Sequence, residues 1–220
     1  MNLNKMSKPA PLHIVLDLDN TLIYSIPYRK SYPEWIKKFH THKMMSAGAA
    51  HEDFLVLERP FLRLFLKWLF THFNVSVWSA GTPDYVDYIV KHIITPPGSG
   101  RKLHKVFTSN DCDKSVNDFG GVSLKRLDML YKTYPKLYSK NNTIIVDDLK
   151  CVVTDQPENA IRIIKFLDKE KFVEDTKLLE LIEKLKCLVK SPEIGNEPVQ
   201  VLLAKSKKSP KKGSQPRKSV

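Results

Sequence analysis

Short apolar runs that end in polar residues alternate along this chain with longer stretches of helical periodicity. The runs predict buried strands at residues 12–17, 73–78, 142–147 and 160–166. Apolar residues spaced for one face of a helix predict helices over residues 60–72, 82–94, 123–134 and 171–189. Pro60 stands where proline is favoured, at the first position of the first helix. Strands that alternate with helices predict an α/β fold, with a mainly parallel central sheet flanked by helices.

Two long stretches do not follow this alternation. Residues 25–53 come after the first strand and are aromatic and irregular, and residues 95–121 precede the helix that begins near Ser123. Long insertions in a compact domain are usually lids or binding loops. We therefore expect the variable, substrate-facing parts of the molecule in these two places.

The composition narrows the class of protein. The chain has 220 residues, 42% of them apolar, which is enough for one domain with a sizeable core. No run approaches the roughly 18 apolar residues that a membrane span needs. The three cysteines are odd in number and far apart, which indicates neither a disulfide framework nor a zinc ribbon. We expect an intracellular protein with no membrane partner.

Positive charge is concentrated at the C-terminal end of the sequence. The net charge is +12, and residues 205–220 hold seven basic residues and no acidic one. Such a segment buries too little apolar surface to order itself, so we predict a catalytic domain over 1–190 and a disordered basic tail over 191–220. The tail is typical of nuclear import signals and of nucleic-acid-binding arms. We expect a nuclear location, with a cytoplasmic one as the alternative.

Oxygen-bearing side chains follow three of the predicted strands. Asp17 and Asp19 follow the first strand, Ser79 the second, and Asp147 and Asp148 stand at the end of the third. Ligands bind at the carboxyl ends of parallel strands, where these side chains would converge. Four carboxylates would repel one another unless a cation were bound, and oxygen ligands favour Mg²⁺. A lone Asp-x-Asp is usually a turn, but the joint pattern is far more specific.

The stretch DLDNT at residues 17–21 resembles the Asp-x-Asp-x-Thr signature of the haloacid-dehalogenase (HAD) superfamily. The fuller series IVLDLDNTL, ERP, VWSAG, LKRL, TIIVDD and QPENAIRI resembles the phosphatases that act on the C-terminal repeat domain of RNA polymerase II, the NLI-interacting-factor-like family. The resemblance covers roughly residues 12–189. It implies a HAD-like Rossmannoid fold and a Mg²⁺-dependent phosphatase for phosphoserine and phosphothreonine.

The resemblance also implies a role for each polar residue. Asp17 would attack phosphorus and form an aspartyl-phosphate, and Asp19 would act as general acid and then as general base. Thr21 would hold the turn through its side-chain hydrogen bond. Ser79 would bind a phosphoryl oxygen, and Lys125 would neutralise Asp17 and the phosphoryl group.

The same resemblance implies the metal ligands. Mg²⁺ would be held by the Asp17 carboxylate, the Asp19 carbonyl, and the acids Asp147 and Asp148, together with phosphoryl oxygens. Catalysis would then consist mostly of positioning and charge neutralisation.

The expected substrate is a phosphoprotein with Ser-Pro sites, such as the RNA polymerase II repeat. Family members read such peptides through an apolar pocket near the first insertion. Phe54 and Val56 are candidates for its wall, and Ser79 and Ala80 are further candidates for substrate contact. The alternative is that residues 54–57 form an ordinary hairpin strand.

Two other functions remain open from the sequence. One is a phosphatase for the 3′-phosphate ends of nucleic acids, which the basic tail at residues 205–220 would suit. The other is a non-catalytic scaffold, although scaffolds of this fold tend to lose the catalytic acids that this chain keeps.

Overall fold

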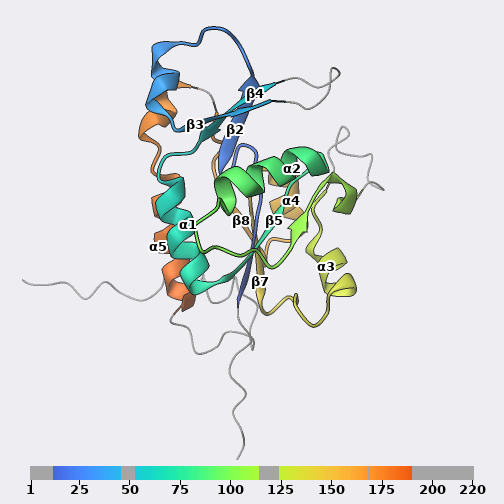
Figure 1. Ribbon diagram of the computed structural model, residues 1–220. Coiled ribbons are helices and arrows are strands. Elements are labelled where there is room, and N and C mark those ends of the chain that lie inside the picture. The colour runs from blue at the N-terminus through green and yellow to red at the C-terminus, as the bar shows by residue number, and fades with distance from the viewer. Residues whose placement is uncertain (1–11, 46–52, 114–123, 168, 190–220) are drawn as a thin grey trace, which may run out of the picture.

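The computed structural model describes residues 12–45, 53–113, 124–167 and 169–189. Five strands form one parallel sheet in the order β6-β5-β1-β7-β8 (Figure 1). They are β1 (His13–Leu16), β5 (Asn74–Trp78), β6 (Val106–Phe107), β7 (Thr143–Asp147) and β8 (Ala160–Arg162). In the register of the central strand, Leu16 lies beside both Val77 and Val146. The predicted α/β fold with a mainly parallel sheet is confirmed.

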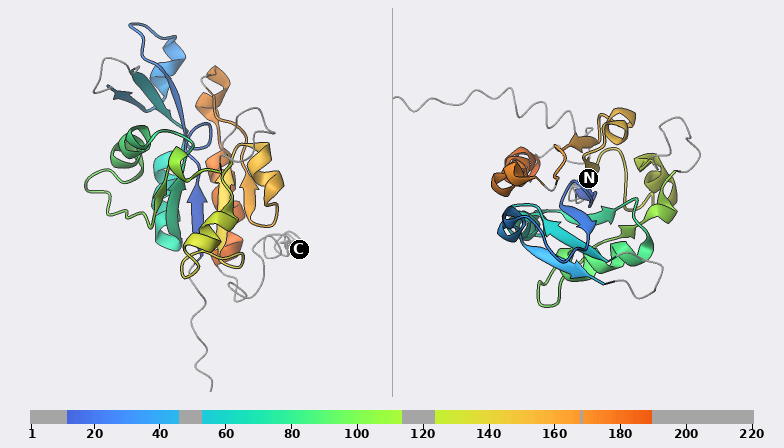
Figure 2. Two further views of the ribbon diagram at one scale, coloured as in Figure 1. Left: turned by 90° about the vertical axis from the view of Figure 1, so that its right-hand side faces the viewer. Right: turned by 90° about the horizontal axis from the view of Figure 1, so that it is seen from above.

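Different helices cover the two faces of this sheet (Figure 2). Ile14 and Leu16 pack with residues of α1 (Leu62–His72), α2 (Pro83–Ile89) and α5 (Lys177–Val189). Val15 points to the opposite face and packs with residues of α3 (Leu127–Thr133) and α4 (Lys150–Asp155). Successive side chains of a strand point to opposite faces, so one apolar run supplies both cores.

The first insertion contains a second sheet. In it, β2 (Ile23–Pro27), β3 (Thr41–Met44) and β4 (Phe54–Glu58) pair antiparallel in the order β2-β4-β3. The sheet stands above the carboxyl ends of the parallel strands, at the top of Figure 1. A 3₁₀ turn over Glu34–Lys38 adds Ile36 to a small core with Phe39 and Phe166. The stretch expected to be irregular therefore contains strands of a β-sheet, joined by a loop and a 3₁₀ turn over residues 28–40.

Several predicted boundaries are wrong, for local reasons. Phe61 has a left-handed backbone with φ 65°, so α1 begins at Leu62 and Pro60 lies outside it. The helix predicted from residue 123 begins at Leu127, and Ser123 lies outside the described residues. The final helix begins at Lys177, where Asp175 accepts a hydrogen bond from the first backbone N–H.

Two other predicted elements differ from the observed ones, one divided and one shortened. The helix predicted over 82–94 consists of α2 and a π-helical turn, Val90–Ile94. The fourth strand covers Ala160–Arg162 alone rather than 160–166.

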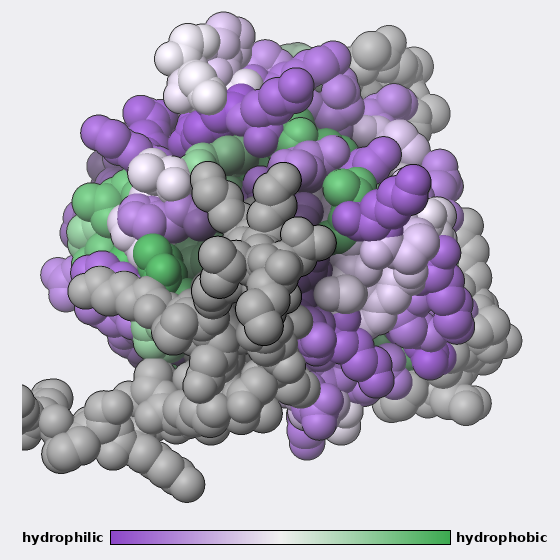
Figure 3. Space-filling model, turned by 90° about the horizontal axis from the view of Figure 1, so that it is seen from below, coloured by the Kyte–Doolittle hydropathy of each residue, from purple (hydrophilic) through white to green (hydrophobic). Residues whose placement is uncertain are grey.

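Within the described residues, no helix is both long enough and apolar enough to cross a bilayer. Where grey atoms do not cover it, the lower end of the molecule shows small apolar patches separated by polar residues (Figure 3). The predicted tail over 191–220 lies outside the described residues.

Candidate active site

The ends of the neighbouring strands β1 and β7 bring three acids to one place. Asp17 follows β1, Asp147 ends β7, and Asp148 comes directly after it. One carboxylate oxygen of each residue lies within 4.8 Å of the others, and all three side chains are buried. The backbone N–H of Asp17 donates to the Val146 carbonyl at 3.0 Å, which ties the first acid to the neighbouring strand. The convergence that the strand order implied is therefore present in the structure.

Lys125 compensates part of this negative charge. Its Nζ donates to Asp17 Oδ1, and to Asp147 Oδ2 at 2.9 Å, and the side chain is only 2% exposed. Burial alone would lower the pKa of the Lys125 ammonium, but the two carboxylates outweigh burial and raise that pKa above its usual value. Lys125 lies in the segment before α3, not on a helix as the sequence indicated.

The net charge of this cluster is negative, which favours the binding of a cation. Three carboxylates face a single buried ammonium, and burial, followed by the charge of Asp17, raises the pKa of both Asp147 and Asp148. Asp17 Oδ2 and Asp148 Oδ2 are buried and find no hydrogen-bond donor among the described residues. Lys165 reaches Asp148 only as an ion pair at 3.6 Å. Unpaired buried carboxylate oxygens are the donors that Mg²⁺ takes, so the residues present fit this ion.

The surroundings of Asp19 differ from those of the three clustered acids. Its Oδ1 accepts a hydrogen bond of 2.5 Å from the Tyr85 hydroxyl, and the Tyr85 oxygen lies 2.6 Å from Ser25 Oγ. Tyr85 comes from α2 and Ser25 from β2, so the contact joins the main domain to the second sheet. Burial raises the pKa of the Asp19 carboxyl to about 6, although the Tyr85 hydrogen bond opposes the rise.

The sequence reasoning did not identify Tyr85. The residue lies on a helix that was correctly predicted, but no motif links it to Asp19. The one available signal is a polar-tipped aromatic in the first turns of the helix that follows Ser79, and that signal is weak.

Thr21 lies in a tight turn that is held differently from the expectation. The Leu18 carbonyl accepts hydrogen bonds from the backbone N–H groups of Thr21, Leu22 and Ile23, at 3.2, 2.8 and 3.1 Å. The buried Arg59 guanidinium donates to the Thr21 carbonyl at 2.9 Å. Thr21 Oγ1 is buried and has no hydrogen-bond partner among the described residues. The predicted side-chain hydrogen bond is absent because backbone groups and Arg59 already hold the turn.

Ser79 ends β5 at the same edge of the sheet. It is 1% exposed, its backbone N–H donates to the Phe107 carbonyl at 3.1 Å, and its Oγ accepts from the Gly81 N–H at 3.0 Å. A Cβ at Gly81 would lie 2.7 Å from the Tyr85 ring, so this turn needs glycine to pass the tyrosine. Ala80 is exposed beside it.

The two candidates for the pocket wall differ. Val56 is fully buried in the main core, so its side chain offers no surface to a peptide, and that assignment is wrong for a packing reason. Phe54 is half-buried, and its ring lies 6.3 Å from that of Tyr85. The hairpin-strand alternative describes β4 correctly.

Comparison with known proteins identifies the family. The family model for NLI interacting factor-like phosphatases matches residues 12–194, and this chain belongs to that family. A CTD phosphatase-like protein of Invertebrate iridescent virus 3 is 34% identical over 183 residues, which cover 78% of this chain and 94% of the relative. The ubiquitin-like domain-containing CTD phosphatase 1 of Danio rerio is 27% identical over 188 residues, covering 83% of this chain and 51% of the relative.

A solved structure shows the same fold. The fission yeast RNA polymerase II CTD phosphatase Fcp1, bound to beryllium fluoride, superposes with a TM-score of 0.52 at 18% identity. The match covers 89% of this chain and 54% of that one. At this identity the likeness shows the fold alone, and it confirms the HAD-like expectation.

Proposed function

We propose that this chain is a Mg²⁺-dependent phosphoprotein phosphatase that acts on phosphoserine and phosphothreonine through an aspartyl-phosphate on Asp17. The observation that carries the proposal is the buried cluster of Asp17, Asp147 and Asp148 around Lys125, with Asp19 beside it. Membership of a phosphatase family supports it. A scaffold would not need so many buried charges, each of which is costly without a function.

The two half-reactions follow from the two aspartates. In the first, a carboxylate oxygen of Asp17 attacks phosphorus, the bond from phosphorus to the serine oxygen breaks, and Asp19 gives that oxygen its proton. In the second, Asp19 takes a proton from water as the water oxygen attacks phosphorus. Inorganic phosphate leaves, and the Asp17 carboxylate is restored.

The other side chains of the site orient the reacting groups and neutralise the charge of the phosphoryl group. The carboxylates of Asp17, Asp147 and Asp148 would hold Mg²⁺, and when bound the ion supplies positive charge to the phosphoryl oxygens. Lys125 holds Asp17 in place and adds a second positive charge. Ser79 Oγ accepts its bond from Gly81 and its hydroxyl also hydrogen-bonds Asp19, so we infer that the hydroxyl hydrogen turns from Asp19 to a phosphoryl oxygen when substrate binds.

The proposed substrate is a phosphoprotein with Ser-Pro sites, such as the RNA polymerase II C-terminal repeat, encountered in the nucleus. The names of the relatives from Danio rerio and fission yeast support this substrate class. The ring of Phe54 from the second sheet lies beside that of Tyr85 from α2, whose hydroxyl reaches Asp19, and we propose that these two rings contact such a peptide.

One experiment tests the proposal directly. Phosphate release is measured from a Ser-Pro phosphopeptide, the same peptide with alanine in place of proline, and a 3′-phosphorylated DNA oligonucleotide, each with Mg²⁺ and with EDTA. We expect Mg²⁺-dependent release that is fastest with the Ser-Pro peptide. Faster release from DNA would replace the protein substrate by a nucleic acid, and no release from any substrate would contradict a phosphatase.

A further inference from the structure

Lys125 needs a support that neither a helix nor a strand provides. The residue lies between Leu124, which pairs with Asp113 through backbone hydrogen bonds of 2.8 and 3.3 Å, and Leu127, the first residue of α3. Its ammonium must nevertheless meet two buried carboxylates at once. A buried ion pair of this kind is favourable only when its geometry is accurate, so the backbone of Lys125 has to be held.

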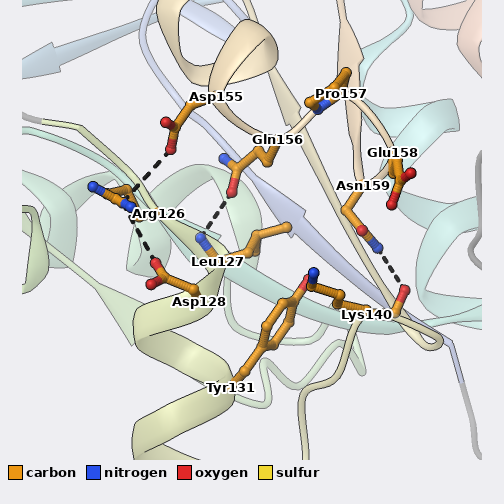
Figure 4. A pocket seen from close by; sticks show the side chains of 10 residues that line it. All are labelled: Arg126, Leu127, Asp128, Tyr131, Lys140, Asp155, Gln156, Pro157, Glu158 and Asn159. Carbon is orange, nitrogen blue, oxygen red and sulfur yellow. Dashed lines mark hydrogen bonds and ion pairs between the residues drawn. The ribbon is translucent and has the colours of Figure 1, made fainter.

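Gln156 holds this backbone on both sides of Lys125. Its Nε2 donates to the Lys125 carbonyl at 2.7 Å. Its Oε1 accepts from the Leu127 N–H at 2.8 Å, a contact that Figure 4 shows. The Leu127 N–H is one of the helix-terminal donors that have no acceptor within the helix. Because one backbone group only accepts and the other only donates, a side-chain amide is the group that satisfies both.

Gln156 also connects Lys125 to the metal-binding acids. It follows α4, which begins two residues after Asp148 and spans about 9 Å at 1.5 Å per residue. The turn after Gln156 also contains Asn159, whose Nδ2 donates to the carbonyls of Lys140 and Thr143 at 2.7 and 2.8 Å, away from Lys125. The acids and the lysine therefore belong to two segments that Gln156 joins.

The ion pairs of Arg126, the residue after Lys125, offer a weaker support. Arg126 forms ion pairs with Asp113, Asp128 and Asp155, at 3.5, 3.5 and 3.6 Å. The guanidinium is 37% exposed, and pairs of this length and exposure contribute little. The amide of Gln156 is the stronger candidate for the support.

We propose that Gln156 is a positioning residue for Lys125, and that it sets the lysine against Asp17 and Asp147 through the backbone of residues 125 to 127. The inference rests on the proposed function, since it assumes that Lys125 serves the reaction. Gln156 itself touches no reacting atom, so its removal should act through Lys125 alone.

The test compares Gln156→Met, which loses both hydrogen bonds at similar volume, with Asn159→Leu. Asn159 is the matched control because its amide lies close by in the chain and also makes two hydrogen bonds to the backbone, in its case to two carbonyls away from Lys125. We expect kcat with an aryl phosphate to fall roughly tenfold in Gln156→Met, since each hydrogen bond contributes about two- to tenfold. Both variants should lower the melting temperature by similar amounts, because each loses two hydrogen bonds. The kcat of Asn159→Leu should nevertheless stay within about twofold of the wild-type value.

A double-mutant cycle separates positioning from general stability. In the Lys125→Met background, Gln156→Met should have no further effect on kcat, because the group that it positions is gone. An equal loss in both backgrounds, or wild-type turnover in Gln156→Met, would overturn the proposal.

Crystal structures of the two single variants provide a measurement that does not need turnover. Lys125 Nζ should leave hydrogen-bond distance of Asp147 in Gln156→Met and keep it in Asn159→Leu. An unmoved lysine in Gln156→Met would refute the inference. Absence of Mg²⁺-dependent turnover in the wild type would instead refute the proposed function, and the crystal structures would still decide the role of Gln156.

Discussion

Asp17 and Asp19 are two residues apart, yet their surroundings differ in kind. The Asp17 carboxylate is buried against the ammonium of Lys125, in a cluster with two further acids. The Asp19 carboxyl meets a neutral hydroxyl from Tyr85 and lies at the boundary with the second sheet. The first setting gives the Asp17 carboxylate a buried positive partner, and the second, where burial raises the pKa of Asp19 to about 6, suits a group that gives and takes a proton.

The difference supports two separate roles for the two acids of one short motif. Asp17 receives Asp147 from the neighbouring strand β7 and Lys125 from the segment before α3. Asp19 receives its partner from α2 and, through Ser25, from an insertion. The proposed nucleophile therefore depends mainly on the parallel sheet, whereas the proposed acid depends on how the insertion packs onto that sheet.

The largest effect should come from Asp17→Asn. The substitution keeps the shape of the side chain but removes the nucleophilic charge, so turnover of an aryl phosphate should fall by roughly a thousandfold or more. Asp87→Asn is the control, because Asp87 is an exposed partner of Lys91 on α2. Substantial residual turnover in Asp17→Asn, with the control unchanged, would remove Asp17 from the reaction.

The next effect concerns the charge balance around Asp17. Lys125→Met leaves buried carboxylates without their ammonium, which should reduce the free energy of unfolding by about 3–5 kcal/mol in EDTA. Mg²⁺ should raise the melting temperature of this variant more than that of the wild type, because the cation replaces the missing charge. Thermal unfolding in Mg²⁺ and in EDTA measures the loss of stability and the shift in melting temperature that Mg²⁺ causes.

The exposed pair of Lys91 and Asp87 supplies the control for that comparison, since Lys91→Met removes an ammonium that is 67% exposed. Its melting temperature should hardly change in either condition. Equal Mg²⁺ shifts in Lys125→Met and the wild type would show that the ion does not bind in this cluster.

Asp19→Asn probes the other aspartate. An aryl phosphate has a good leaving group that needs little protonation, while a serine alkoxide needs a proton. Formation of the phosphoenzyme should therefore slow by about a hundredfold or more with a phosphoserine peptide, and much less with an aryl phosphate. Rapid-quench measurements with both substrates test this, and an equal loss with both would contradict an acid role.

Tyr85→Phe removes the hydroxyl that supports Asp19. We expect a loss of roughly tenfold with a phosphoserine peptide, in the same direction as Asp19→Asn but smaller, because the carboxyl itself remains. Tyr88→Phe is a close control, since the Tyr88 hydroxyl also links α2 to the second sheet, by donating to the Lys43 carbonyl at 2.9 Å. Similar losses in both variants would mean that Tyr85 acts by docking the sheet rather than by supporting Asp19.

The contrast between the parallel sheet and the insertion also explains which parts of the structure could be predicted from the sequence. β1, β5 and β7 are almost wholly buried, and the polar residues at their ends, Asp17, Ser79 and Asp147, follow directly from the sequence pattern. In the second sheet only β4 was foreseen, as the alternative of a hairpin strand over residues 54–57. β2 and β3 were missed because they are largely exposed or half-buried, so their alternation is faint. Tyr85 and Gln156 were missed because they act through contacts between distant segments, which spacing along the chain does not encode.

The smallest effect on the site should come from deleting residues 205–220. The motifs end before this segment, so turnover of an aryl phosphate should be unchanged, while duplex DNA binding or nuclear accumulation should weaken. If all seven basic residues engaged phosphates, log affinity against log salt would slope at roughly −6, and the slope should approach zero in the truncated chain. A full-length chain with glutamine at the seven basic positions separates charge from length. A several-fold fall in turnover with unchanged DNA binding and localisation would place the segment with the catalytic domain, and the separation between domain and tail would be wrong.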